Sequence, residues 1–196
     1  MAERRSMSKK EREKWRAKEW YTVLAPQAFN NVKIAEILGA SPESIVGRNV
    51  EVTMQELTGT FSKQSLKFIF KISDTQGLQA NTRFLKHTMA ENTTKLARKR
   101  HTKIDQIADA DTLDGYKIRL KVLAITERKI HNSQESEIRQ RIVSFLNEKI
   151  QKATMEELLK ALVDEKLSSE LYKECRIISP LRRLDIRASE VLSSPK

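Results

Sequence analysis

The spacing of hydrophobic residues changes near residue 130, and this change restricts the folds that the chain can adopt. Before it, apolar and polar residues alternate, as in GRNVEVTMQEL (47–57) and SLKFIFKIS (65–73), which is the period of strands with one buried face. From Gln134 to Gln151 the apolar residues recur every three or four positions, as on one side of a helix. Strands followed by helices predict an α+β fold.

The strands are expected to be short, mostly antiparallel and about seven in number. The first is WYTVL (20–24), and the stretch 32–38 fits either a strand or a helical turn. An Asp114-Gly115 turn joins two strands within 101–127, and LRRLDIRASEVL (181–192) is expected to return as an edge strand. We expect an antiparallel, closed or nearly closed β-barrel core with the C-terminal helices packed on it.

Helix starts are predicted from capping patterns, in which a side chain accepts a hydrogen bond from the backbone three residues on. The predicted pairs are Asn132 with Glu135, Thr154 with Glu157, and Thr88 with Glu91. The first two open helices over 134–151 and from 154 onward, and the third opens a short basic helix to about residue 98. A further helix is expected over 168–175.

Three local features of the expected sheet are also predicted. Met54 alternates with Val50 and Val52 and is therefore placed in their strand. A turn is expected over 74–77. Near the end of the second hairpin strand the apolar phase shifts to Leu123 and Ile125, which indicates either a bulge or a strand covered on both faces.

The length of 196 residues suits one domain with charged ends. Residues 1–19 hold eight basic and four acidic side chains and too few apolar ones to fold alone, so we expect a basic, mobile N-terminal arm. Residues 20–190 are expected to form a single domain of β-barrel plus helices, and residues 191–196 a flexible tail.

The chain carries 37 Lys and Arg against 26 Asp and Glu, a net charge of +11, which favours a polyanionic partner. Nucleic acid is favoured over a membrane, because no apolar run approaches the roughly 20 residues of a spanning helix. The start of the chain has no apolar segment typical of a secretory signal. One cysteine, Cys175, fits a reducing cytoplasm and is expected in a helix core.

Three basic clusters give the candidate RNA-binding residues: the arm, the stretch 83–103 and the stretch 179–187. These candidates are Lys9, Lys10, Arg12, Lys14, Trp15, Arg16, Lys18, Lys95, Arg98, Lys99, Arg100, His101, Lys103, Arg182 and Arg183. Trp15 is expected to stack on a base while neighbouring cations hold phosphates. Trp20, beside the first apolar run, is expected to anchor the edge of the barrel.

No catalytic or metal-binding motif is found, and no cofactor or small-molecule substrate is predicted. Four aspartates crowd the stretch before Gly115: Asp105, Asp109, Asp111 and Asp114. They do not match the calcium-loop pattern counted from Asp109. Asp114 and Gly115 each lie one residue later than the pattern requires, and the twelfth position, which should be glutamate, is Leu120. A polar strand end and turn is the better interpretation. His87, His101 and His131 lie in separate segments and are expected at the surface or facing RNA.

Four blocks of the chain resemble a small-subunit ribosomal protein family that archaea and eukaryotes share, the S3Ae family. The blocks are KWRAKEWYTVLAP (14–26), IVGRNVEVTMQEL (45–57), TLDGYKIRLKVLAIT (112–126) and IISPLRRLDIR (177–187). The resemblance spans about residues 8–190 and implies a non-catalytic constituent of the small subunit, on the platform near the mRNA exit side. It further implies contacts with small-subunit rRNA near its 3′ end and with neighbouring ribosomal proteins, and makes mRNA near the exit a further expected contact.

The chain stops at SEVLSSPK, without the longer C-terminal extension of the eukaryotic members, so an archaeal member is expected. Two rival functions are also compatible with a basic chain of this kind. A free barrel-type RNA-binding factor, such as an RNA chaperone or single-strand binder, would show several exposed aromatic residues, whereas the phenylalanines here alternate into predicted strand cores. A metal-dependent nuclease would depend on Asp109 and Asp111.

Overall fold

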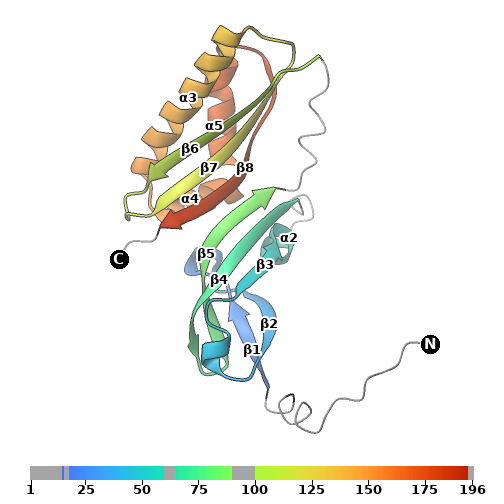
Figure 1. Cartoon of the computed structure of the whole chain (residues 1–196), viewed down its shortest axis with the longest axis vertical. Helices are drawn as coiled ribbons and strands as arrows, with labels where there is room; N and C mark the ends of the chain where they lie inside the picture. The colour runs from blue at the N-terminus through green and yellow to red at the C-terminus, as the bar shows by residue number, and fades with distance from the viewer. Residues whose placement is uncertain (1–14, 16–17, 60–64, 90–99, 194–196) are drawn as a thin grey trace, which may run out of the picture.

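The strands form one eight-stranded sheet, and a layer of helices covers one part of it (Figure 1). The computed structural model describes residues 15, 18–59, 65–89 and 100–193. The strands are β1 (Glu19–Leu24), β2 (Lys33–Gly39), β3 (Asn49–Thr53), β4 (Leu66–Gln76), β5 (Gln79–Met89), β6 (Lys103–Asp111), β7 (Lys117–Thr126) and β8 (Leu181–Ser193). The helices are α2 (Met54–Thr58), α3 (Asn132–Gln151), α4 (Met155–Val163) and α5 (Lys166–Arg176), with short 3-10 turns η1 (Gln27–Phe29) and η2 (Pro42–Ser44). The α+β prediction is confirmed.

Strand β5 is the branch point of the sheet. It pairs with β4 along nearly its whole length. It also pairs with β1 in parallel at its start, over 79–81, and with β8 in antiparallel fashion near its end, over 86–88. Strands β3 and β2 extend the sheet beyond β4 and β1, and β7 and β6 extend it beyond β8. The short β5–β8 ladder therefore joins the two parts of the sheet.

The predicted barrel is wrong, because the sheet is open. Within the described residues β2, β3 and β6 each pair with one neighbour, so each keeps a free edge. The side chain of Arg48, just before β3, donates from Nη1 to the Leu38 carbonyl of β2 at 3.1 Å, but no ladder pairs these two strands. Alternation reports which face of a strand is buried and carries no information about closure of the sheet.

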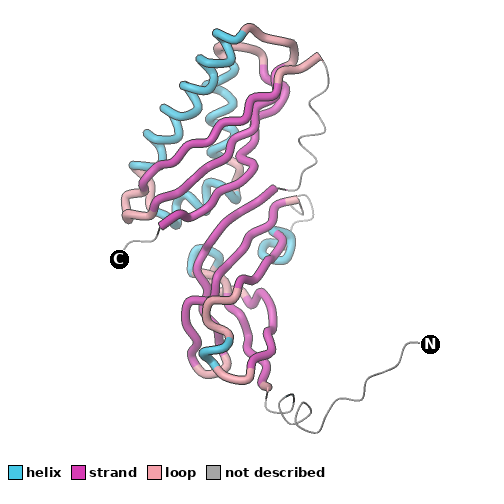
Figure 2. The backbone as a smooth tube through the Cα atoms, in the orientation of Figure 1, coloured by secondary structure: helices cyan, strands magenta, loops and turns pink. Residues whose placement is uncertain are grey.

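Two hydrophobic cores lie on the two parts of the sheet. The N-terminal lobe, β1–β5 with α2, is built around residues such as Phe68 and Phe70. The C-terminal lobe, β6–β8 with α3–α5, is where the helices cover one face of the strands (Figure 2). Helix α4 serves both, since Leu158 packs in the C-terminal core and Leu159 in the N-terminal one. A single domain over 20–190 stays a prediction.

Most element predictions are confirmed, with corrections at two helix starts. Thr154 and Glu157 cap α4 as predicted. The cap of α3 is His131 with Gln134, so the predicted pair one residue later is wrong. Thr53 and Glu56 form an unpredicted capping box that ends β3 and turns Met54 into the first residue of α2. The buried Met54 keeps its core position with a different backbone.

Several strand details also differ from expectation. Strand β8 pairs with both β5 and β7 and is therefore central, not an edge. The predicted turn over 74–77 moves to Gly77, whose φ of +61° suits glycine, because β4 continues to Gln76. The stretch 32–38, which fitted either a strand or a helical turn, forms strand β2. For β7 both alternatives hold, because its pairing shifts register after Lys121 and every residue over 122–126 is buried. Thr88 lies within β5, and the rest of its predicted helix falls outside the described residues.

Single side chains refine the picture. Trp20 is 63% exposed, so its predicted role as an anchor of the barrel edge is wrong: Tyr21 and Val23 occupy the inward face of β1, and alternation turns Trp20 outward. His87 is buried instead of lying at the surface. Cys175 is buried in the core as predicted, and burial raises the pKa of its thiol to about 11. Among the described helices none is long and apolar enough to cross a membrane.

Candidate nucleic-acid interface

The structure describes seven of the fifteen predicted RNA-binding residues. These seven are Trp15, Lys18, Arg100, His101, Lys103, Arg182 and Arg183. The others, Lys9, Lys10, Arg12, Lys14, Arg16, Lys95, Arg98 and Lys99, lie outside the described residues. The described ones fall in two places: Trp15 and Lys18 precede β1, and the remaining five lie where β6 and β8 begin.

Three strand ends meet at this second place. Strand β6 begins opposite the end of β7, with Lys103 paired with Ile125, and β8 begins on the other side, with Leu181 paired with Thr126. Backbone bonds continue the alignment beyond the strands, since Glu127 N donates to the Pro180 carbonyl at 3.0 Å. Segments far apart in the sequence are therefore held side by side at one end of the C-terminal lobe.

His101 joins these segments. Its Nδ1 lies 3.0 Å from the carbonyl oxygen of Thr126 and 2.9 Å from that of Glu127. Because a carbonyl oxygen only accepts, Nδ1 carries the ring proton, and Nε2 is left to accept from Arg182 Nη1 at 3.2 Å. His101 thus acts as a bracket that holds the Arg182 guanidinium at the strand ends.

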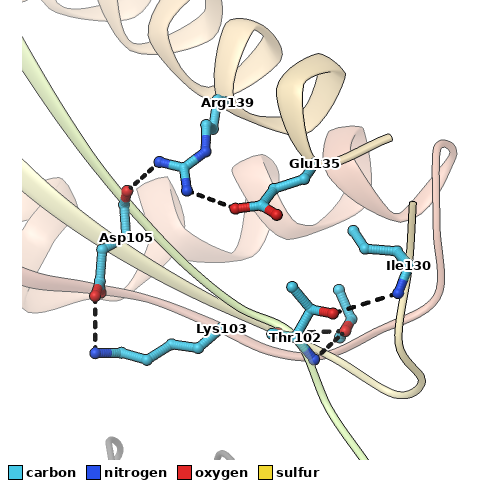
Figure 3. Close-up of polar contacts among 7 residues, drawn as sticks. Thr102, Lys103, Asp105, Ile130, Glu135 and Arg139 are labelled. Carbon is cyan, nitrogen blue, oxygen red and sulfur yellow. Dashed lines mark hydrogen bonds and ion pairs between the residues drawn. The ribbon is translucent and has the colours of Figure 1, made fainter. Parts of the chain in front are cut away.

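Two threonines fix the loop that follows β7. Thr102 N donates to Thr126 Oγ1 at 2.9 Å, and Thr126 Oγ1 donates to the Arg128 carbonyl at 2.5 Å. Ile130 N donates to Thr102 Oγ1 at 3.3 Å, a contact visible in Figure 3. The loop therefore presents Arg128 and Lys129, both exposed, beside the start of β6. These two cations were missed by the sequence prediction.

We call Arg100, His101, Arg128, Lys129 and Arg182 the strand-end cluster. Its four Lys and Arg side chains are exposed and make no ion pair with another described residue. Glu127 is the acidic side chain of the same loop. Exposed guanidinium and ammonium groups on a fixed backbone are suited to phosphate oxygens, which give affinity and orientation without reading sequence.

Lys103 and Arg183 lie at the same end of the sheet but are already engaged. Lys103 Nζ lies 2.7 Å from Asp105 Oδ2, a contact drawn in Figure 3, and Arg183 pairs with Asp185. Burial raises the pKa of Asp185, and Arg183 acts against that shift. These two predicted residues therefore present less free positive charge than the strand-end cluster does.

Three of the four aspartates before Gly115 have structural partners, and that of Asp105 is Lys103. Asp109 accepts two bonds from Arg119, at 2.7 and 2.8 Å, and this side-chain bonding lowers the pKa of Asp109. Asp114 Oδ2 accepts from Met155 N at 2.8 Å, at the start of α4. Across the part of the chain that the structure describes, no group of three His, Cys, Asp or Glu side chains is placed to hold a metal ion.

A cleft of about 590 Å³ between the lobes is lined by both basic and acidic side chains. Lys71 and Arg83 lie directly opposite each other on β4 and β5, and Met155 and Leu159 of α4 form part of the apolar wall. Like charges in register repel, but the cleft also contains the carboxylates of Asp114 and Glu156, so its lining carries no net positive charge. Lys71 and Arg83 come together only through the register of β4 and β5, and no local sequence motif predicts this.

Comparison with known proteins agrees with the resemblance drawn from the four sequence blocks. Residues 6–195 match the Ribosomal S3Ae family. Relatives named small ribosomal subunit protein eS1 include that of Methanobrevibacter smithii, 39% identical over 183 residues, covering 93% of this chain and 95% of the relative. That of Methanothermobacter thermautotrophicus is 37% identical (94% and 95% covered), and that of Sulfurisphaera tokodaii 32% identical (94% and 96%). All three are archaeal, in agreement with the expected origin.

Proposed function

Because this chain belongs to the Ribosomal S3Ae family, we propose that it is a structural, non-catalytic constituent of the small ribosomal subunit and supports translation. The match over residues 6–195 and relatives named small ribosomal subunit protein eS1 support this assignment. The protein then works in the cytoplasm on the ribosome. From the family resemblance we place it on the platform near the mRNA exit side, with mRNA as a further expected contact.

The strand-end cluster is the surface that we assign to small-subunit rRNA. The observation that supports it best is the bracket at His101, which holds Arg182 beside the loop carrying Arg128 although the two arginines come from distant segments. Fixing cations before binding lowers the entropy lost when they meet phosphates. The arm residues of 1–19 are proposed to add further phosphate contacts, as a segment that orders on RNA.

We assign the helical layer to neighbouring ribosomal proteins. Residues 132–176 hold nine acidic and eight basic side chains, while the whole chain has an excess of eleven positive charges. Ion pairs such as Arg141 with Glu174 and Lys149 with Glu170 already link α3 to α5. A nearly neutral face attracts RNA weakly, which leaves it for protein contacts.

Sedimentation tests the proposed function. The protein in a cell extract is expected to travel with small subunits at low salt and to be released only by strong salt, because its RNA contacts are electrostatic. If the whole population instead stays in the ribosome-free fraction, the proposal fails and a free RNA-binding factor takes its place.

Replacing Arg100, Arg128 and Arg182 together by glutamine is expected to weaken binding to small-subunit rRNA and to flatten its salt dependence. Each lost phosphate contact removes about 0.7–0.9 from the slope of log affinity against log salt, so the triple variant should lose about 2–3. A filter-binding titration at several salt concentrations measures this slope.

The matched control replaces Lys33, Lys67 and Lys152 by glutamine, which removes the same net charge from exposed ion pairs elsewhere. An equal change of slope in both triple variants would mean that only total charge matters, and the strand-end cluster would then lose its assignment.

A further inference from the structure

Both tryptophans of the chain are exposed, and they differ in this from its other described aromatic residues. Trp15 is 58% and Trp20 63% exposed. The phenylalanines and tyrosines that the structure describes lie within or against the two cores. An indole has a large apolar face that is unfavourable in water, so two of them left outward within six residues indicate a surface that meets a partner.

A cation lies over the ring of Trp15. Lys18 Nζ lies 4.3 Å from the centre of the Trp15 ring, and Lys18 N donates to the Trp15 carbonyl at 3.3 Å. A cation over one face of an indole leaves the other face for a further stacking partner. Trp15 and Lys18 are therefore already arranged as a pair.

Trp20 has a cation near its strand partner. It pairs across the ladder with Leu38, whose carbonyl accepts from Arg48 Nη1. Arg48 is exposed and has five N–H donors, of which this bond uses one. The remaining donors of an anchored guanidinium suit a phosphate next to a base on the indole.

We propose that Trp15 and Trp20 form a stacking surface for unpaired RNA nucleotides, with Lys18 and Arg48 neutralising the adjoining phosphates. This inference rests on the proposed function and names the kind of RNA that the start of the fold contacts. Bases within a duplex have their faces covered by neighbours, so exposed aromatic faces select single-stranded segments. A purely apolar protein partner is disfavoured, because Lys18 lies over the Trp15 ring and Arg48 is bonded to the strand partner of Trp20.

Intrinsic fluorescence tests this directly, because the two tryptophans are the only ones in the chain. The full-length protein is titrated with a single-stranded oligoribonucleotide of about 12 nucleotides, and separately with the duplex of the same sequence. Quenching is expected at lower concentration with the single strand. Trp15→Phe leaves Trp20 as the reporter and keeps a ring at position 15.

Trp20→Ala is expected to weaken single-strand binding about tenfold, as loss of one stacked base would, without changing the melting temperature. The matched control is Leu113→Ala, an equally exposed apolar side chain in the C-terminal lobe, which should bind like the unchanged protein. A lower melting temperature for Trp20→Ala would mean that the ring supports the fold, and would overturn its assignment to RNA.

Equal quenching by duplex and single strand would also overturn the inference, because charge alone would then explain binding. If no RNA changes the fluorescence but Trp20→Ala protein leaves the small subunit, the indoles contact protein and the inference fails. In that case the unchanged protein still sediments with small subunits, so the proposed function survives.

Discussion

Replacing Phe68 by alanine should lower the free energy of unfolding by about 3–5 kcal/mol, the usual range for a fully buried phenylalanine. Phe68 is 1% exposed. Its ring centre lies 5.6 Å from that of Phe29, 6.2 Å from Phe70, 6.1 Å from Phe84 and 5.3 Å from His87. The substitution removes these ring contacts and leaves a cavity that the surrounding strands cannot fill. Urea denaturation followed by circular dichroism measures the loss.

Two further variants make this result informative about domains. Leu146→Ala, in the other core, should cost about 2–5 kcal/mol, and Ile107→Ala, on an exposed face of β6, should cost little. Because the β5–β8 ladder and α4 join the two cores, we expect each core variant to shift one common transition. If Phe68→Ala instead melts the N-terminal lobe separately, the single domain predicted over 20–190 does not exist.

Sequence patterns predicted the elements that bury one face. In β4, Leu66, Phe68, Phe70 and Ile72 are all buried, as their alternation required. In α3 the buried residues Ile138, Ile142, Leu146 and Ile150 follow the helical stripe. Burial of one face requires apolar residues at the repeat of the helix or strand, so a short window of sequence is enough to detect it.

Features that depend on contacts between distant segments produce no such local pattern in the sequence. Pro180 and the arginines that follow it resemble an edge strand, yet β8 lies between β5 and β7. The error at Trp20 has a different cause: its apolar neighbours suggested burial, but the phase set by Tyr21 and Val23 points it outward. The alternation along β1 was therefore visible in the sequence, but the apolar character of tryptophan was given more weight than its position in the strand.

The candidate RNA-binding surface was partly predictable for a similar reason. Arg100, His101 and Arg182 were selected by charge, but the contact between His101 and Arg182 depends on tertiary structure. Arg128 was open to prediction, since the ladder of this hairpin is centred on Asp114, as Lys103 opposite Ile125 shows, and so brings position 128 opposite position 100. Counting charges along the chain overlooked this geometry.

The strongest pH effect on stability is expected from His87, at the joint between the lobes. His87 pairs with Ser189 in the short β5–β8 ladder, and its Nδ1 lies 3.3 Å from Ser189 Oγ. Burial lowers the pKa of His87 to about 4 from the usual 6.5. Between pH 4 and 6.5 the His87 imidazole is protonated in the unfolded chain but stays neutral in the folded protein. The free energy of unfolding therefore falls as the pH falls.

The stabilisation from neutral His87 is complete above about pH 6.5 and is lost by about pH 4, a change of about 3 kcal/mol. Asp185 lines the same small cavity, and its raised pKa acts in the opposite direction, so the effect is read from a comparison of variants. His87→Gln, neutral at every pH, should lose most of the decrease seen in the unchanged protein between pH 6.5 and 4 in urea titrations. If both proteins lose stability in parallel over this range, the acid sensitivity arises elsewhere, and the buried imidazole does not make the joint between the lobes sensitive to acid.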